Sequence, residues 1–203
     1  MFFRIITVLI VMAGLYTLYG IGHFHLMHHR IYNPVVDFQV KDEAKAGTTV
    51  VEFLNYGCGY CKSLHPTIEE LLRIRNDIRY IVKPVVFGDG AMVRLNQIVI
   101  ASGLQGKFWE MHEAILNHPE QIPPDSFLEE TANLFGLDYE QLLEDAQGEE
   151  VKKIADKNLK ATEHANIYAV PAFVIKRDIH IVTDENLPDL KDLLDIIAEA
   201  ENS

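Results

Sequence analysis

A strand–helix–strand pattern between residues 48 and 86 places the strongest constraint on the fold. Thr48–Asn55 is β-branched and apolar, which is typical of a strand buried on both faces. Gly57 ends this strand, and apolar residues then recur at helical spacing from Cys58 onward. Ile78–Val86 has the pattern of a second strand. Two strands joined by a helix are expected to be parallel, with a right-handed crossover.

The residues that follow predict a block of helices. Helical patterns continue from residue 91 to residue 167. Within this block, Ser126 and Glu129 form a capping-box pattern, and Gly136 fits the end of the same helix. Asp138 is expected to begin the next helix.

Two strands and a helix are predicted to close the chain. Ala172–Lys176 and Ile179–Thr183 suggest a hairpin, and Leu187–Ala200 has a helical pattern. A small mixed sheet with helices on both faces is the compact solution for this order of elements. We therefore expect a membrane or signal segment, a first α/β part, a helical insertion and a second α/β part, at residues 1–30, 31–90, 91–167 and 168–203.

The N-terminus carries an apolar run, Ile5–Gly22, without charge. As a helix, its 18 residues would extend about 27 Å, close to the bilayer's hydrocarbon thickness of about 30 Å. Arg4 favours a cytoplasmic N-terminus with the rest outside. We expect an uncleaved anchor, because the run has no convincing Ala-x-Ala cleavage site; a cleaved signal peptide is the alternative.

Four histidines follow this run within seven residues: His23, His25, His28 and His29. Such a cluster could bind copper, nickel or zinc. No carboxylate or thiol lies nearby in the sequence to complete a specific site, so we expect a partly titrating segment just outside the membrane. Asn33-Pro34 breaks any helix and marks the start of the globular part.

The charge of the chain is strongly negative and unevenly spread. The formal net charge is −12, and Phe108–Val151 holds twelve acids with no Lys or Arg. This balance argues against nucleic acid, and against an anionic lipid surface, as a partner of the globular part. We interpret the acids as solvated helix faces; a surface that selects cationic partners is the alternative.

Cys58 and Cys61 are the two cysteines of the chain. Cys58 is expected at the N-terminus of a helix, where the helix dipole and free N–H groups stabilise a thiolate and make it a nucleophile. Cys61 follows one turn later, where it can attack a mixed disulfide at Cys58. A structural zinc site would need two more ligands, and two inert buried cysteines are a further alternative.

Two other positions add to this prediction. Glu52 is the one charged residue in the apolar strand Thr48–Asn55. Burial would raise the pKa of its carboxyl, which would suit it to accept a proton from Cys61. The alternative is a glutamate at the edge of the sheet that reaches solvent. Val170-Pro171 precedes a strand, where an X-Pro bond can be cis, although an ordinary trans proline is the simpler interpretation of these residues alone.

These residues together resemble the DsbA-like family of the thioredoxin superfamily, the bacterial thiol:disulfide oxidoreductases. The resemblance rests on Glu52–Lys62 around the cysteines, on Pro66, on Gln105–His112 and on Val170–Phe173, and it extends over residues 35–200. It implies an α/β thioredoxin fold with an inserted helical domain, preceded here by one N-terminal transmembrane or signal helix. It also places the globular part in the periplasm, or outside the cell, of a bacterium whose inner membrane holds the anchor.

The resemblance also implies roles for single residues. Cys58 would be the attacking cysteine, Cys61 the resolving one and Glu52 the buried acid. Pro171 would be a cis-proline, and Val170 would offer backbone hydrogen bonds to an extended client. Substrate contacts are likewise expected at Gly59 and Tyr60, which lie between the cysteines and help to set the redox poise.

The expected function is an extracytoplasmic exchange of disulfides with protein substrates that carry cysteine thiols. We favour an oxidase, while isomerase and reductase stay open because Gly59-Tyr60 resembles the dipeptide of periplasmic isomerases. No cofactor is needed, because the cysteine pair is the redox centre, but a redox partner must reset it. The alternative function is a metal-binding protein or metal chaperone that uses the cysteine pair and the histidine cluster.

Overall fold

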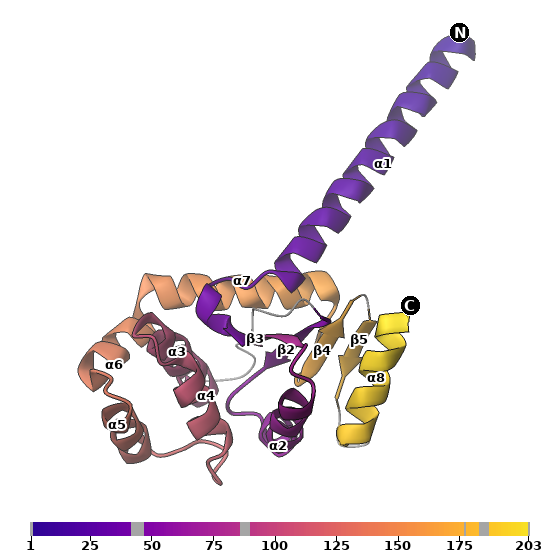
Figure 1. Cartoon of the computed structure of the whole chain (residues 1–203). Coiled ribbons are helices and arrows are strands. Elements are labelled where there is room, and N and C mark those ends of the chain that lie inside the picture. Colours follow the sequence, from indigo (N-terminus) through magenta and orange to yellow (C-terminus); the bar gives the residue numbers. More distant parts are fainter. Residues whose placement is uncertain (1, 42–46, 86–89, 177, 183–186, 203) are drawn as a thin grey trace.

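The computed structural model describes residues 2–41, 47–85, 90–176, 178–182 and 187–202. It contains a central sheet flanked by helices, with one long helix that projects from the body (Figure 1). The strands are β1 (Val40–Lys41), β2 (Thr49–Leu54), β3 (Arg79–Pro84), β4 (Ala172–Ile175) and β5 (Asp178–Ile181). The helices are α1 (Phe2–Tyr32), the short 3-10 turn η1 (Asp37–Gln39), α2 (Gly59–Ile74), α3 (Gly90–Leu104), α4 (Phe108–Leu116), α5 (Asp125–Leu134), α6 (Tyr139–Gln147), α7 (Glu149–Ala165) and α8 (Leu190–Asn202).

The sheet confirms the predicted topology. Its strand order is β1-β3-β2-β4-β5, with β2 and β3 parallel and every other neighbouring pair antiparallel. The β4–β5 pair is the expected hairpin. Two residues of that predicted hairpin, Arg177 and Thr183, lie outside the described residues, as does Val86 at the end of the predicted strand Ile78–Val86. The strand β1 was not predicted, because two residues are too short to show a hydrophobic period.

Alternation along each strand divides the core between the two faces of the sheet. On one face, Val50 and Leu54 pack with α2, α8 and the helical block. On the other face, Val51 and Phe53 pack against α7 and the end of α1. The central strand β2 is therefore buried on both sides, as its apolar sequence predicts, and Glu52 faces α2 with Val50 and Leu54.

The helical block forms as predicted except at the start of α5. Asp138 caps α6 by accepting a hydrogen bond from the Gln141 N–H (3.0 Å), and Gly136 ends α5 with a positive φ of 73°. The predicted capping box at Ser126 is wrong. The N-cap is Pro124 and the helix begins two residues earlier than Ser126 would place it, because Pro124 takes an extended conformation and its carbonyl accepts from the N–H groups of Phe127 and Leu128.

The end of α1 is built into the body of the protein. Ile31 is buried among residues of β2, β3 and α7. The buried Lys83 of β3 donates from Nζ to the carbonyl oxygens of Arg30 (3.0 Å) and Asn33 (2.7 Å), which satisfies carbonyls at the helix end. Burial, with Arg79 nearby, lowers the pKa of Lys83 to about 8. The end of α1 is thus fixed to the sheet by the side chain of Lys83 from β3.

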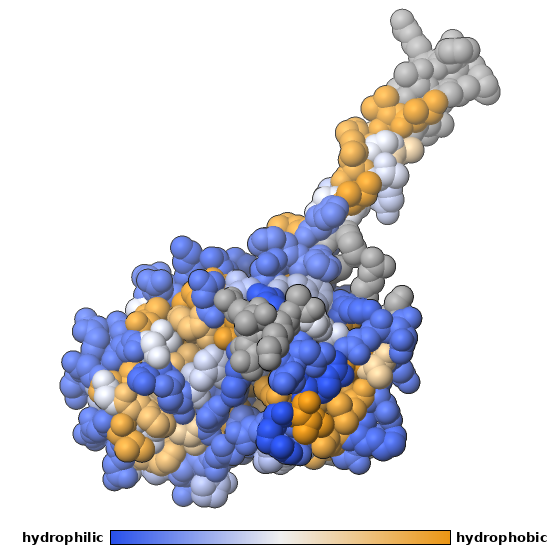
Figure 2. Space-filling model, viewed as in Figure 1, coloured by the Kyte–Doolittle hydropathy of each residue, from blue (hydrophilic) through white to orange (hydrophobic). Residues whose placement is uncertain are grey.

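Apolar residues of α1 lie outside the body. The segment Ile10–Tyr32 is long and apolar enough to cross a membrane, as judged by length and composition. Figure 2 shows apolar side chains along the described part of this helix and hydrophilic ones where it meets α7. Asn33-Pro34 follows the last helical residue, Tyr32, as the sequence predicts. The helix therefore continues unbroken through the histidine cluster.

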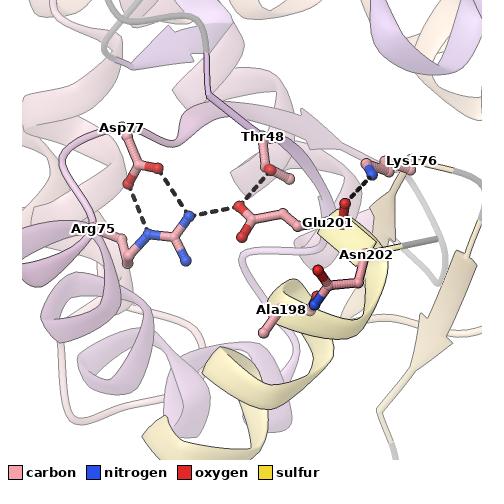
Figure 3. Close-up of polar contacts among 7 residues, drawn as sticks. All are labelled: Thr48, Arg75, Asp77, Lys176, Ala198, Glu201 and Asn202. Atoms are coloured by element: carbon pink, nitrogen blue, oxygen red, sulfur yellow. Dashed lines mark hydrogen bonds and ion pairs between the residues drawn. The ribbon is translucent and has the colours of Figure 1, made fainter.

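A polar network holds α8 against the turn between α2 and β3 (Figure 3). Arg75 donates two hydrogen bonds to Asp77 (2.7 and 2.9 Å) and a third to Glu201 (2.6 Å). Thr48 donates to the same Glu201 oxygen at 2.6 Å. These two donors, Thr48 first, hold the pKa of Glu201 below its ordinary value. The network joins the start of β2, the end of α2 and the C-terminal helix.

We expect Arg75→Met to lower the free energy of unfolding by about 1–2 kcal/mol, because it removes the bidentate ion pair with Asp77 and the single hydrogen bond to Glu201, which lies 126 residues away in the sequence. Urea unfolding of the detergent-solubilised full chain measures this change. Arg73→Met is the matched control, since Arg73 is more exposed and pairs within its own helix with Glu70. The control should change the free energy of unfolding much less than Arg75→Met does, because an exposed ion pair contributes little, and equal losses would contradict the assignment.

Candidate active site

The turn between β2 and α2 positions Cys58 as the N-cap of α2. The Cys58 N–H donates to the carbonyl of Asn55 (2.9 Å). The Asn55 side chain accepts from the Gly57 N–H (2.8 Å) and donates to the Val85 carbonyl (3.0 Å). A buried asparagine therefore organises the turn and ties it to the end of β3. Cys58 is half-buried, in agreement with the prediction that it begins the helix.

Cys58 and Cys61 have opposite electrostatic environments. Both are free thiols, and Cys61 is buried with 1% of its surface exposed. A hydrogen bond from Cys61, helped by the N–H groups of Cys61 and Tyr60, lowers the pKa of Cys58 to about 6 although partial burial opposes this shift. Burial raises the pKa of Cys61 well above its ordinary value, and Cys58 and Glu52 add to the rise. At neutral pH, Cys58 is therefore a thiolate and Cys61 a thiol.

Glu52 lies behind the cysteines in the middle of the sheet. It is paired with Val82 of β3 and Phe173 of β4, so the alternative of a strand-edge position is wrong. Only 3% of its surface is exposed, and it accepts a hydrogen bond from the hydroxyl of Tyr80. Burial raises the pKa of Glu52 to about 7, against the lowering effect of the Tyr80 hydrogen bond. Such a carboxyl can exchange a proton near neutral pH.

The chain segment before β4 lies against the thiol of Cys58. The Val170-Pro171 bond is cis, which confirms the expectation from the family resemblance and corrects the simpler trans interpretation. Sγ of Cys58 lies 3.4 Å from the carbonyl oxygen of Val170, to which it can donate when it is protonated. Gly59 and Tyr60 are exposed at the start of α2, with 43% of Tyr60 accessible. The structure thus places the predicted substrate-contacting positions next to Cys58. They are Gly59 and Tyr60 on one side, and Val170 and Pro171 on the other.

The helical block contacts the active-site helix through polar groups that sequence reasoning missed. Lys62 donates from Nζ to the carbonyls of Ile115 (2.6 Å), His118 (3.2 Å) and Glu120 (2.9 Å). Gln121 reaches back to the carbonyl of Gly57 through its side-chain amide at a short distance. Desolvation lowers the pKa of Lys62 to about 8. These contacts fix α2 relative to the end of α4, and only proximity to Cys61 could have indicated Lys62 in the sequence.

A second buried pair lies next to the cysteines. The hydroxyl of Tyr56 is 2.9 Å from Nδ1 of His112, and both residues are almost fully buried. Burial lowers the pKa of His112 well below its ordinary value, so the ring is neutral and Nδ1 can accept a hydrogen bond from the Tyr56 hydroxyl. Burial, with Glu52 and Cys61 nearby, raises the pKa of Tyr56. His112 belongs to the segment that carries the family resemblance, but its contact with Tyr56 was not predicted.

The four histidines near the end of α1 do not join the cysteines. Among the residues that the structure describes, no three side chains of His, Cys, Asp or Glu gather closely enough to hold a metal ion. The ring of His23 instead lies 5.9 Å from that of His164 in α7. The alternative function in metal binding therefore has no assembled set of ligands within this part of the chain.

Comparison with known proteins places these features in a family. A model of the DSBA-like thioredoxin domain matches residues 49–195. Among curated proteins, a Na⁺/H⁺ antiporter NhaA 3 of Salinispora tropica is 28% identical over 145 residues, or 70% of this chain and 22% of the antiporter. NhaA 1 of Salinispora arenicola is 35% identical over 92 residues, 44% of this chain and 14% of that protein. The chain thus spans about a fifth or less of these antiporters.

Solved structures share the fold at low sequence identity. A thioredoxin-like oxidoreductase of Silicibacter pomeroyi superposes with a TM-score of 0.75 at 20% identity, covering 86% of this chain and 98% of that one. The thiol-disulfide exchange protein α-DsbA2 of Wolbachia pipientis gives 0.73 at 17% identity, with coverage of 88% and 94%. The catalytic domain of Proteus mirabilis ScsC gives 0.73 at 19%, with coverage of 90% and 98%. These likenesses confirm the thioredoxin-like fold.

Proposed function

Because this chain belongs to the DSBA-like thioredoxin domain family, we propose that it is a thiol–disulfide oxidoreductase that acts on the cysteines of other proteins. The observation that carries this proposal is the difference between its two cysteines. The half-exposed Cys58 has a pKa of about 6, whereas that of the buried Cys61 is raised. A nucleophile at the surface and a protonated partner behind it are what a two-step exchange requires.

In the oxidising direction, the pair begins as a Cys58–Cys61 disulfide. A client thiolate attacks Sγ of Cys58, a mixed disulfide forms, and Cys61 leaves as a thiolate that takes a proton. A second client thiolate then attacks the client sulfur of the mixed disulfide and releases Cys58 as a thiolate. The client has lost two electrons and gained a disulfide, and the Cys58–Cys61 pair has gained those electrons. The reductive direction reverses each step.

We assign the roles of the remaining residues from their positions around these sulfurs. Glu52 gives and takes the proton of Cys61, since its pKa of about 7 allows both states at neutral pH. Val170 and Pro171 present the backbone beside Cys58 to an extended client segment, as their contact with the thiol suggests. Gly59 and Tyr60 are exposed between the cysteines and contact the client directly.

The low pKa of Cys58 favours the oxidase over the isomerase and the reductase. A stabilised thiolate stabilises the reduced pair, which makes the disulfide a stronger oxidant. The equilibrium potential against glutathione distinguishes the three activities. A value near about −120 mV identifies an oxidant, one near about −180 mV an isomerase-like exchanger and one near about −270 mV a thioredoxin-like reductant. A redox partner is needed to restore the starting state in each case.

We further propose that α1 anchors the protein in a bacterial inner membrane, with its N-terminus in the cytoplasm and the globular part in the periplasm. The length and composition of Ile10–Tyr32, the exposure of its apolar part Ile10–Gly22 and the positive charge of Arg4 support this arrangement. Resistance of the full chain to alkaline carbonate extraction from bacterial membranes tests it, and protease protection of the globular part in spheroplasts would contradict the orientation.

The titration of Cys58 tests the exchange function. Ultraviolet thiolate absorbance of the reduced full chain should show a midpoint near pH 6, because the Cys61 thiol and two helix N–H groups stabilise the Cys58 thiolate. The Cys58→Ser variant is the control, and it should lose this transition. A midpoint at the ordinary value of about 8.5 would contradict the role of Cys58 as an activated nucleophile.

A further inference from the structure

The junction of α1 and α7 forms a cavity that is open to solvent and lies outside the active site. Its volume is about 450 Å³, and four basic side chains line it: His29, Arg30, Lys157 and Lys160. Asn33 contributes a polar wall at the end of α1. Figure 1 shows this junction where the long helix leaves the body, on the opposite side of the sheet from α2. The proposed exchange reaction uses none of these residues.

The basic side chains of α7 form an ordered stripe. Lys153, Lys157, Lys160 and His164 recur along α7 at spacings of four, three and four residues, which places them on one helix face. The contact of His164 with Arg30 shows that this face is turned toward α1. The acids of α7 beside the stripe, Asp156 and Glu163, fall on its flank by the same helical spacing. The chain's net charge of −12 therefore hides a local concentration of positive charge.

Arg30 is held in place from two sides. Nδ1 of His164 lies 2.6 Å from the carbonyl of Lys160, to which it can donate, and Nε2 then accepts from the Arg30 guanidinium at 2.8 Å. In this arrangement His164 is the hydrogen-bond acceptor that orients the Arg30 guanidinium. The buried Lys83 fixes the backbone of Arg30 through its carbonyl. The arginine at the cavity is thus positioned before any ligand binds.

The cavity lies close to the point where the apolar run of α1 ends. The apolar run ends at Gly22, and His29 follows seven residues later, which is about 10 Å along a helix. The headgroup layer on each side of a bilayer is about 5–8 Å thick, by the difference between its full and hydrocarbon thicknesses. By this count His29 lies just beyond the headgroup layer of an upright α1, so the long side chains of Arg30, Lys157 and Lys160 need to reach only a few ångströms back to the lipid phosphates.

We propose that this cavity binds the phosphate headgroup of an anionic phospholipid of the bilayer that holds α1. Arg30 supplies a planar, prepositioned donor set, while Lys157 and Lys160 supply mobile charges from the facing helix. The lipid's acyl chains lie along the exposed apolar surface of α1. This inference rests on the proposed membrane anchoring and is independent of the cysteine chemistry.

Native mass spectrometry of the detergent-solubilised full chain tests the proposal, with phosphatidylglycerol and phosphatidylcholine as probes. The protein should retain phosphatidylglycerol in preference to phosphatidylcholine. The double variant Lys157→Gln, Lys160→Gln should weaken the retention of phosphatidylglycerol about tenfold or more, because two charges near the phosphate are removed. The control Lys152→Gln, Lys191→Gln removes the same charge from exposed positions away from the stripe and should leave retention unchanged.

Three results would overturn the proposal. Equal retention of both lipids would mean that the cavity does not recognise a charged headgroup. Equal losses in the test and control variants would mean that overall charge, not this cavity, attracts the lipid. Displacement of phosphatidylglycerol by millimolar inorganic phosphate, with phosphate itself bound stoichiometrically, would identify a site for soluble phosphate instead of lipid.

Two parallel measurements separate this proposal from the proposed function. Carbonate extraction of the same variants reports whether α1 is anchored, and oxidation of a dithiol peptide reports whether the cysteine pair is active. Anchored, active protein without lipid preference would contradict the headgroup site alone. Extraction by carbonate would contradict both the anchoring and the headgroup site, and leave the exchange activity to be judged by the peptide assay.

Discussion

Replacing Cys61 with Ala should convert a transient mixed disulfide into a stable one. Cys58 still attacks a client disulfide as a thiolate, but the sulfur that would release the client is absent. Client proteins linked to Cys58 should therefore accumulate in the membrane fraction of cells that express the variant. Non-reducing electrophoresis followed by reduction and mass spectrometry measures this accumulation and identifies the clients.

Two further variants make the Cys61 experiment decisive. Cys61→Ser retains a hydroxyl that can donate to the Cys58 thiolate, so it should trap clients while the pKa of Cys58 stays low. Cys61→Ala instead loses the largest stabilising contribution to that thiolate, so the pKa of Cys58 should rise. Adding Cys58→Ser to either variant should abolish the complexes. Complexes that persist without Cys58 would show that trapping occurs elsewhere, and their absence from both Cys61 variants would contradict the resolving role.

Glu52→Gln should have opposite effects on catalysis and on stability. Gln keeps the oxygen that accepts the Tyr80 hydrogen bond, but it cannot take the proton of Cys61. Attack of Cys61 on a mixed disulfide should therefore slow on the order of a hundredfold, within the usual contribution of a general base. Stopped-flow measurement of client release from a preformed mixed disulfide gives this rate.

The same substitution should stabilise the fold above neutral pH. Burial raises the pKa of Glu52 from 4.5 to about 7, so between these values the folded state binds more protons than the unfolded state. Stability therefore falls as the pH rises through this window, and the loss is complete above pH 7. A shift of this size corresponds to about 3 kcal/mol, which is the expected stabilisation by Glu52→Gln at alkaline pH.

Urea unfolding at acid and alkaline pH checks this linkage. The wild-type chain and Glu52→Gln should have similar stability near pH 4, diverge as the pH rises from about 4.5 to about 7, and keep a constant difference above pH 7. Glu130→Gln is the control, because Glu130 is exposed on α5 and should show no such divergence. A variant that is less stable than wild type at every pH would mean that Glu52 contributes mainly through hydrogen bonding.

Local patterns in the sequence predicted the main elements and the positions of the two cysteines well. The apolar, β-branched run of β2 and the helical spacing after Cys58 sufficed for the parallel β2–β3 pair and for the N-cap position. Glu52 could be predicted as a buried acid because a charge interrupts an apolar strand. The cis bond before Pro171 followed only from the family resemblance, since the residues alone allow both isomers.

Contacts between distant elements could not be predicted in the same way. Tyr56 meets His112 across 56 residues, and Lys62 reaches carbonyls that are 53 to 58 residues away. Nothing in the spacing of either partner specifies such pairs, because they depend on how the helical block packs against α2. The composition argument against an anionic lipid surface failed to detect the cationic stripe of α7 for the same reason: averaging over the sequence removes spatial clustering.

The joint between α1 and the sheet limits how far the reactive sulfur can travel. Lys83 and Ile31 make the end of the helix part of the folded core, so no slack linker separates the two. In a bilayer, the globular part would rotate together with α1 as one rigid body. The distance between Cys58 and the membrane surface would then vary only within a narrow range. A redox partner in the same membrane must then present its own cysteines within that range, whereas soluble clients come to Cys58 by diffusion.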